Sequence, residues 1–327
     1  MMDYEIIPTL GPASETESTW RLMLEAGATA FRLNTSHLSM DELGGWLDRM
    51  EPFLSVTQPL VPLVLDLQGS KWRLGEFAPC ELTQAQKVRL VYAATSDRPG
   101  VLPVPHTDLF TAAQRSSGEL ALNDAKVRMR IEAVGPDWLE ARVVQPGGLK
   151  PHKGITFTNS SYRIESLNEK DRRFIEQTRG ISRIRYAISY VRDAAEMRHY
   201  RELFGSSAYL AAKIERLTAV EQAVQIAAAS DEIWLCRGDL GAELGMTDMA
   251  QTVHGFGELA GEIALPRLMA GQVLEHMTEH AAPTRSEVCY LYDTLLGGYR
   301  GVVLSDETAI GSYPVEACRA AALFKKV

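Results

Sequence analysis

Three charged side chains follow two short apolar segments, in a pattern that is typical of a site and not of a core. Lys213 and Glu215 end the segment LAAKIE (210–215), and Asp239 follows the apolar run of EIWLCRGDLGAE (232–243). Such runs are typical of buried parallel strands, whose side chains alternate with a period of two, so Lys213 and Glu215 are expected on one side of a strand. Two carboxylates beside a lysine predict a site for a divalent cation and a phosphorylated or enolate substrate.

Two simpler interpretations of these residues are also open. The pair Lys213 and Glu215 would also suit a solvated ion pair at a strand end, and Asp239 would also suit a cap of the following turn. The ion-pair interpretation predicts that the side chains of Lys213 and Glu215 are exposed. The capping interpretation predicts that Asp239 has no role beyond the turn.

The elements that position these residues alternate along the chain. Short apolar segments with the character of buried strands lie between amphipathic stretches with the period of a helix, which predicts βα units around a parallel sheet. The strand-like segments are 5–10, 28–34, 60–67, 183–191, 209–215, 232–239, 264–271 and 301–306. The helical stretches include 14–27, 170–180, 194–205 and 218–230. Eight strands predict an α/β fold of the (β/α)8 TIM-barrel type, whose active site lies at the C-terminal ends of its strands.

A region with a different pattern interrupts the alternation. Segments 86–93, 121–134 and 138–146 alternate β-branched with charged residues and are separated by Pro- and Gly-containing turns. This pattern predicts a small β-barrel-like domain that is inserted after the third barrel strand and acts as a lid. The predicted domains are a first barrel part at 1–69, the lid at 70–153 and a second barrel part at 154–327.

Composition restricts the class of protein. The chain has 327 residues, of which 46% are hydrophobic and 23% charged, as in soluble globular proteins. Its net charge of −8 argues against nucleic acid as a partner, and the sequence contains neither a long apolar run nor a signal-peptide pattern. The four cysteines, Cys80, Cys236, Cys289 and Cys318, are scattered without metal-ligand spacing. A reduced, cytoplasmic protein without a membrane partner is therefore expected.

An ordered set of short motifs from Thr9 to Pro314 resembles the signature segments of the pyruvate kinase family. The motifs are TLGPAS (9–14), FRLNTSH (31–37), LDLQGSKWR (65–73), KGITF (153–157), LNEKD (167–171), AISYVR (187–192), AAKIE (211–215), RGDLGAE (237–243), PTRSE (283–287) and LSDETAIGSYP (304–314). The resemblance implies a (β/α)8 barrel with a β-rich domain inserted after strand three. It also implies that the sequence ends where the family's C-terminal domain would begin, so that the usual allosteric control is expected to be absent.

The resemblance also implies roles for residues around the three charged side chains. Glu215 and Asp239 resemble the ligands of Mg²⁺ or Mn²⁺, and Lys213 resembles the catalytic lysine that stabilises the transferring phosphoryl group and the enolate. Arg32 resembles a catalytic phosphate contact. The residues implied in substrate binding are Arg32, Ser189, Lys213, Gly238, Asp239 and Gly271, and those implied in nucleotide binding are Arg32, Asn34, His37, Arg73 and Lys153.

One departure from the family concerns a monovalent cation. Asn34, Ser36 and Asp66 correspond to side chains that line a potassium site, but Lys71 stands where potassium-dependent members have glutamate. An ammonium group there can replace the ion, so no potassium requirement is expected. A several-fold rise in activity when potassium replaces a large organic cation would contradict this.

A second departure concerns proton delivery. Gly271 stands where the family has a threonine whose hydroxyl supports protonation of the enolate, and Gln68 replaces a lysine. Loss of a positioned proton-transfer group costs about 10²–10⁴-fold in rate. Either water fills the space beside Gly271, or the substrate has a larger group.

Three functions are compatible with these features. The first is a phosphotransferase acting on phosphoenolpyruvate and ADP, or on pyruvate and ATP, with a divalent cation. The second is a metal-dependent lyase, decarboxylase or aldolase that stabilises the enolate of a pyruvate- or oxaloacetate-type keto acid. The third is a ligand sensor without turnover. A homodimer through segments 254–267 and 283–296 is a further expectation.

Overall fold

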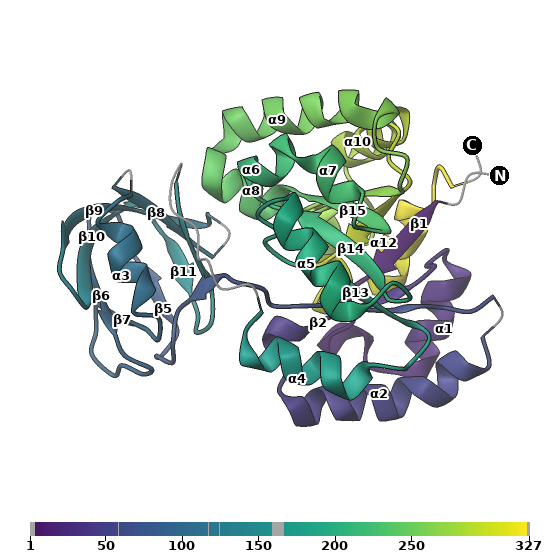
Figure 1. Ribbon diagram of the computed structural model, residues 1–327, viewed down its shortest axis with the longest axis horizontal. Helices are drawn as coiled ribbons and strands as arrows, with labels where there is room; N and C mark the ends of the chain where they lie inside the picture. Colours follow the sequence, from purple (N-terminus) through teal and green to yellow (C-terminus); the bar gives the residue numbers. More distant parts are fainter. Residues whose placement is uncertain (1–3, 58, 117, 124, 159–166, 326–327) are drawn as a thin grey trace. The chain divides into compact units, whose positions relative to one another are not determined.

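Eight parallel strands form the sheet of the larger of two compact units in the computed structural model, which describes residues 4–57, 59–116, 118–123, 125–158 and 167–325 (Figure 1). The sheet order is β1-β17-β16-β15-β14-β13-β3-β2, and an isolated parallel bridge between Thr9 and Arg32 nearly closes it into a barrel. The strands are β1 (Glu5–Pro8), β2 (Phe31–Asn34), β3 (Leu63–Asp66), β13 (Ile184–Ile188), β14 (Tyr209–Ile214), β15 (Glu232–Cys236), β16 (Arg267–Ala270) and β17 (Gly301–Leu304). The predicted (β/α)8 fold is confirmed.

Each predicted strand contains an observed strand, but the observed strands are shorter. The strand β14, for example, ends at Ile214, and Ser189 and Glu215 each lie one residue beyond a strand. Small and apolar side chains such as Val64, Ala187, Ala211 and Trp234 form a core cluster from these strands. The polar site residues therefore begin where the apolar layers of the barrel end.

Helices connect the strands of the larger unit. Their N-termini are well specified, because the side chains of Thr16, Ser39, Asn168, Asp193 and Thr284 each accept a hydrogen bond from a first-turn amide. In Figure 1, α1, α2 and α4 lie along one side of the barrel, and α7 and α10 lie on another. The helices and 3₁₀ turns between and after the barrel strands are η1 (Pro12–Ser14), α1 (Glu17–Glu25), η2 (Thr35–His37), α2 (Met40–Ser55), α4 (Glu169–Thr178), α5 (Ala194–Phe204), α6 (Leu217–Glu221), α7 (Ala223–Ala227), α8 (Arg237–Leu244), α9 (Met246–Glu258), η3 (Leu259–Gly261), η4 (Glu275–Thr278), α10 (Arg285–Leu296), α11 (Asp306–Ala309) and α12 (Pro314–Ala321). Most of α8 and the first part of α9 belong to the smaller unit.

The smaller unit consists of the described residues of Ser70–Ser166 together with Gly238–Thr252. Its seven-stranded sheet has the order β4-β12-β8-β9-β10-β6-β7, and two further strands, β5 and β11, pair with each other. Its elements are β4 (Trp72–Arg73), β5 (Cys80–Leu82), β6 (Lys87–Tyr92), β7 (Val101–Val104), α3 (Asp108–Ala113), β8 (Glu119–Leu122), β9 (Val127–Val134), β10 (Trp138–Gln145), β11 (Gly147–Leu149) and β12 (Gly154–Phe157). This β-rich unit after the third barrel strand agrees with the predicted insertion.

The smaller unit begins at Ser70 but extends beyond residue 153, the end expected from the sequence. Strand β12 begins at Gly154 and pairs with β4 and β8, so the sheet continues to Phe157. Residues 238–252 also belong to this unit, although they follow the sixth barrel strand. The first difference arises from strand pairing, and the second from contacts such as that of Arg128 with the Gly241 carbonyl oxygen. The alternation of side chains along the sequence reports neither.

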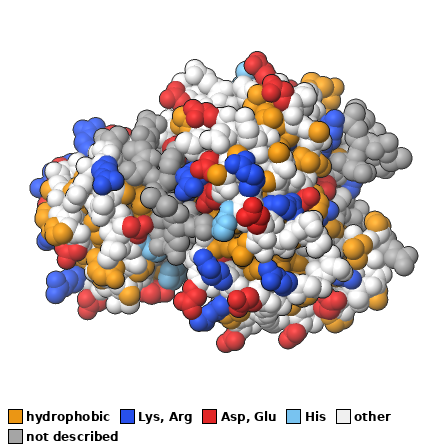
Figure 2. All heavy atoms as spheres, in the orientation of Figure 1, with side chains coloured by type: hydrophobic (Ala, Val, Ile, Leu, Met, Phe, Trp, Pro, Cys, Tyr) orange, Lys and Arg blue, Asp and Glu red, His pale blue; other side chains and the backbone are white. Residues whose placement is uncertain are grey.

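The surface carries charges of both signs. On the face shown in Figure 2, acidic and basic side chains are interspersed among the described residues. Within the part of the chain that the structure describes, no helix has the length and apolar character needed to cross a bilayer.

Candidate active site

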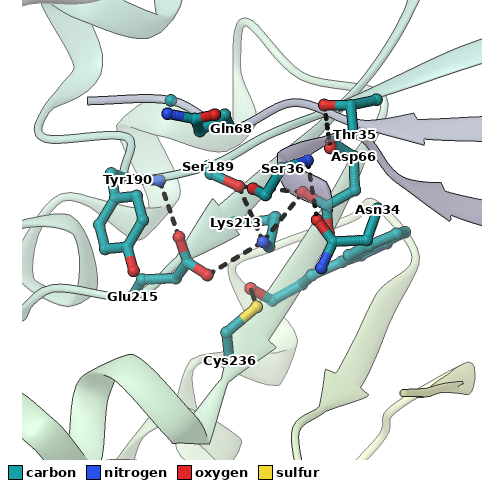
Figure 3. A network of polar contacts seen from close by, with 12 residues as sticks. Asn34, Thr35, Ser36, Asp66, Gln68, Ser189, Tyr190, Lys213, Glu215 and Cys236 are labelled. Carbon is teal, nitrogen blue, oxygen red and sulfur yellow. Dashed lines mark hydrogen bonds and ion pairs between the residues drawn. The ribbon is translucent and has the colours of Figure 1, made fainter. Parts of the chain in front are cut away.

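The Lys213 side chain is the centre of a buried polar network at the carboxyl end of the barrel strands (Figure 3). Its Nζ lies 3.0 Å from Oδ1 of Asp66 and 3.1 Å from Oε1 of Glu215. The same ammonium donates a hydrogen bond of 2.8 Å to Oγ of Ser189. Lys213 and Glu215 are only 9% and 3% exposed, which excludes the interpretation of a solvated ion pair at a strand end.

Asp66 joins Lys213 to Arg32. The Arg32 guanidinium donates from Nε to Oδ2 of Asp66 at 2.7 Å, and its NH2 group lies 2.7 Å from the same oxygen. Oδ1 of Asp66 accepts from the Ser189 hydroxyl at 2.9 Å. A third guanidinium nitrogen of Arg32 donates to Oγ1 of Thr9 at 2.5 Å. One carboxylate therefore orients both of the cations to which the family resemblance gives catalytic roles.

The electrostatics of this network keep Asp66 and Lys213 charged. Burial disfavours the charged form of Asp66, but Lys213 and Arg32 outweigh this effect, so the pKa of Asp66 is lowered. Burial also disfavours the Lys213 ammonium, yet the carboxylates of Asp66 and Glu215 raise the pKa of Lys213 above its ordinary value. Lys213 is therefore a fixed positive charge at neutral pH and not a proton donor with a pKa near neutrality.

Glu215 is held by a backbone group as well as by Lys213. The amide of Tyr190 donates to Oε2 of Glu215 at 2.7 Å. Tyr190 has a φ of +61°, which is uncommon for a residue with a side chain. The Lys213 ammonium and the Tyr190 amide thus orient the two carboxylate oxygens of Glu215.

The loop after β3 is fixed by the LNEKD segment. The buried carboxylate of Asp171 accepts from the amides of Gln68 and Gly69, each at 2.9 Å. Gly69 has a φ of +65°, and a Cβ added there would lie 2.5 Å from the carbonyl oxygen of Ser189. The loop thus packs against the backbone of Ser189, a member of the Lys213 network.

The residues predicted to line a monovalent-cation site are on or beside β2 and β3. Oδ1 of Asn34 accepts from the amide of Ser36 at 3.2 Å and caps η2. The carbonyl oxygen of Ser36 accepts from Nζ of Lys170 at 3.2 Å. The side chain of His37, at the end of η2, is exposed.

Gly271 lies in a left-handed backbone conformation just after β16. Its φ is +88°, and that of Gln272 is +53°. The Arg237 guanidinium donates to the carbonyl oxygen of Gly271 at 2.7 and 3.0 Å and to that of Gln272 at 2.9 Å. A glycine suits this position because it adopts a positive φ without the steric cost of a Cβ.

The smaller unit holds the remaining predicted site residues. Asp239 forms an ion pair with Lys71, whose side chain is 6% exposed. An NH1 group of Arg73 donates to the carbonyl oxygen of His152 at 3.0 Å, and Lys153 is half-buried beside it in sequence. A Cβ added to Gly238 would meet no described atom within 4 Å.

Sequence reasoning did not identify three of these relationships. It gave Asp66 a role in monovalent-cation binding only, it did not single out the Tyr190 amide, and it did not pair Lys71 with Asp239. The positive φ of Tyr190 carries no signal in the residue type. The Asp66 contacts join side chains from three strands, and their spacing along the chain does not report them.

The oxygen donors that could bind a hard divalent cation are carboxylates, which Mg²⁺ and Mn²⁺ prefer. Among the residues that the structure describes, no group of three or more His, Cys, Asp and Glu side chains is placed to hold a metal ion. Mg²⁺ is usually bound through one or two carboxylates plus substrate oxygens and water, so Glu215 of the larger unit and Asp239 of the smaller unit are each a suitable type of ligand.

A nearly closed parallel barrel with a buried lysine–carboxylate network at the carboxyl ends of its strands defines the class of (β/α)8-barrel proteins with a site at that face. The chain belongs to the pyruvate kinase family, because the model of the pyruvate kinase barrel domain matches residues 1–318.

A pyruvate kinase of Agrobacterium vitis is 31% identical over 316 residues, which cover 95% of this chain and 66% of that protein. A pyruvate kinase of Mycobacterium tuberculosis is 30% identical over 320 residues, with 96% and 68% covered. One of Thermococcus litoralis is 31% identical over 318 residues, with 95% and 66% covered. The chain thus spans about two thirds of the length of these relatives.

Proposed function

We propose that the protein is a pyruvate kinase-like phosphotransferase that moves a phosphoryl group between phosphoenolpyruvate and ADP. The observation that carries the proposal is the buried Lys213 ammonium, which Asp66 and Glu215 keep charged at the barrel face where such enzymes have their site. Loss of the phosphoryl group from phosphoenolpyruvate leaves the enolate of pyruvate, which must be stabilised until carbon 3 takes up a proton. A fixed cation that needs no reorganisation supplies such stabilisation.

Arg32 and Ser189 act with Lys213 in this proposal. The Arg32 guanidinium is oriented by Asp66 and Thr9, and a planar guanidinium binds phosphate oxygens with two parallel hydrogen bonds. The Ser189 hydroxyl, which accepts from Lys213, would contact the substrate. Gly238 would allow the backbone to approach the substrate carboxylate, because a Cβ there would meet no described atom within 4 Å.

Glu215 and Asp239 would hold the divalent cation, Mg²⁺ or Mn²⁺. When bound, the cation would neutralise charge on the phosphoryl and enolate oxygens. The Tyr190 amide would orient Glu215 for this role. Availability decides between the two metals, because Mn²⁺ generally binds such oxygen sites more tightly than Mg²⁺.

The nucleotide would bind through Arg73 and Lys153, which lie on or beside β4 and β12 of the smaller unit, together with Arg32, Asn34 and His37. Potassium would not be required, because Lys71 supplies a resident positive charge. The four cysteines form no disulfide, which supports the cytoplasmic location expected from the sequence.

A homodimer is part of the proposal. The helix α10 presents Tyr292 and Leu296 to solvent, with 41% and 69% exposure. Apolar side chains on an outer helix suit a subunit contact. Sedimentation that shows only monomer at micromolar concentration would contradict this contact.

A coupled assay with phosphoenolpyruvate, ADP and Mg²⁺ tests the proposal. Formation of pyruvate and ATP that requires all three components is the expected result. Absence of pyruvate formation at high enzyme concentration would exclude the phosphotransferase.

A second function is favoured by Gly271, which offers no hydroxyl for protonation of the enolate and leaves room for a bulkier keto acid. Release of CO₂ from oxaloacetate that depends on Mg²⁺ and disappears in Lys213→Met would indicate a decarboxylase. Tight binding of phosphoenolpyruvate in calorimetry, with both assays silent, would indicate a ligand sensor.

A further inference from the structure

We propose that Lys71 is a resident counter-ion of Asp239, which a divalent cation must displace in order to bind. This inference rests on the proposed function, because that function makes Asp239 a metal ligand. It goes beyond it by assigning Lys71 a role in controlling metal affinity, and this role is distinct from replacing potassium.

The first observation is the Lys71–Asp239 ion pair itself. Both residues belong to the smaller unit, although 168 positions separate them in the sequence. The side chains of Lys71 and Asp239 are 6% and 17% exposed, so water screens the pair poorly. A second contact holds the Asp239 segment to the same unit, because an NH2 group of Arg128 donates to the carbonyl oxygen of Gly241 at 3.2 Å.

The second observation is the space that Gly154 provides for Lys71. A Cβ added to Gly154 would overlap Cε and Nζ of Lys71, so the ammonium reaches its position only because residue 154 has no side chain. Gly154 does not have a positive φ among the described residues, so backbone conformation does not explain the glycine. The glycine at position 154 of the KGITF motif is therefore explained by packing, because only a residue without a side chain leaves room for the Lys71 side chain.

These observations define a competition. An ammonium and a divalent cation are both attracted to the same carboxylate, and their mutual repulsion disfavours simultaneous binding at one oxygen pair. Without a cation, Lys71 compensates the charge of the partly buried Asp239. With a cation, the ammonium must leave, so the pair lowers metal affinity and makes binding dependent on movement of Lys71.

Binding of Mn²⁺ alone to the complete chain, followed by electron paramagnetic resonance of the free ion, tests the inference. We expect Lys71→Met to lower the dissociation constant about tenfold, within the range typical of coupling between two ligands of one protein. Gly154→Ala keeps the charge of Lys71 but displaces its end, and we expect it to tighten binding in the same direction. Lys87→Met removes an exposed lysine of the same unit and is the matched charge control, with no change expected.

The outcomes separate this inference from the proposed metal site. If Asp239→Asn binds Mn²⁺ as tightly as the wild type, Asp239 is not a ligand and both proposals fail. If Asp239→Asn loses binding while Lys71→Met and Gly154→Ala bind no more tightly than the wild type, the metal site stands and the counter-ion role is overturned. Equal tightening by Lys71→Met and Lys87→Met would reflect general charge removal and would also overturn it.

Discussion

The Lys213 ammonium lies 3.0 Å from Oδ1 of Asp66, a carboxylate that is 2% exposed. Neither group is adjacent to the other in the sequence, and each comes from the carboxyl end of a different barrel strand. Burial of either charge alone would be costly, and together with Arg32 and Glu215 they compensate each other. The network is therefore a preorganised set of two cations and two carboxylates, and it forms without substrate.

Asp66→Asn tests the dependence of this network on its central carboxylate. The substitution leaves Arg32 and Lys213 without their shared anion, and breaking such a buried pair costs about 3–5 kcal/mol. We expect the free energy of unfolding in urea to fall by this amount. Glu169→Gln breaks an exposed helix pair with Arg173 and serves as the control, with a change within about 0.5 kcal/mol. Equal effects of the two substitutions would contradict the account of the network.

A second buried carboxylate, Glu232, predicts a pH dependence of stability. Its Oε2 accepts from the Tyr209 hydroxyl at 2.8 Å, and its Oε1 accepts from the Trp234 indole. The NH1 group of Arg185 lies 3.6 Å from Oε2 of Glu232 and 2.9 Å from Oε2 of Glu5. Burial, with a further contribution from Glu5, raises the pKa of Glu232 to about 7. Between its unfolded pKa and about 7, the folded protein binds more protons than the unfolded chain, so stability falls as pH rises through this window.

Glu232→Gln removes this titration and is expected to be more stable than the wild type at pH 8, by about 1–3 kcal/mol. Urea unfolding at pH 5 and pH 8 measures the difference. At pH 5 the two proteins should be similar, because the wild-type carboxyl is then protonated. The exposed Glu25→Gln is the control. A wild type that is equally stable at both pH values, with no gain in Glu232→Gln, would disprove the assignment.

Gly69 provides a test of the loop between β3 and the smaller unit. Gly69→Ala places a side chain at a φ of +65° and against the Ser189 carbonyl, so unfolding free energy is expected to fall by about 2 kcal/mol or more. Gly45 is the matched control, because it lies within α2 and a Cβ there would meet no described atom within 4 Å outside the neighbouring backbone of its own helix. Gly45→Ala should instead stabilise the protein by about 0.5–1 kcal/mol. Thermal or urea unfolding that ranks the variants in the opposite order would refute this description.

Substitution of Gly271 tests both its backbone conformation and the effect of the missing hydroxyl. Gly271→Thr restores a hydroxyl but places a β-branched residue at a φ of +88°, so we expect a loss of stability of about 1–2 kcal/mol. Under the proposed function we also expect turnover of phosphoenolpyruvate and ADP to rise about tenfold or more, because proton delivery is worth that much. Gly271→Ala imposes a similar backbone cost without a hydroxyl and should not raise turnover. Equal rates in Gly271→Thr and Gly271→Ala would show that the missing hydroxyl does not limit the reaction.

The strands of the barrel were predictable because each is a short run of apolar residues that ends in polar ones. The pair Lys213 and Glu215 was placed on one face by the period of two alone. The short helix α3 was not identified within the β-rich region, and the sheet of the smaller unit extends beyond the predicted boundary through β12. The contacts of Asp66 with Lys213 and of Lys71 with Asp239 join residues 147 and 168 positions apart, and only the fold brings them together.

Exchange of the methyl protons of pyruvate in D₂O, followed by NMR with Mg²⁺ present, tests enolate stabilisation by Lys213 most directly. Both the phosphotransferase and the enolate lyase require that a pyruvate enolate form at this ammonium. The wild type is predicted to exchange the methyl protons, and Lys213→Met is predicted to lose at least about 100-fold in rate, as expected when a preorganised charge is removed. Exchange at the wild-type rate in Lys213→Met would contradict the account.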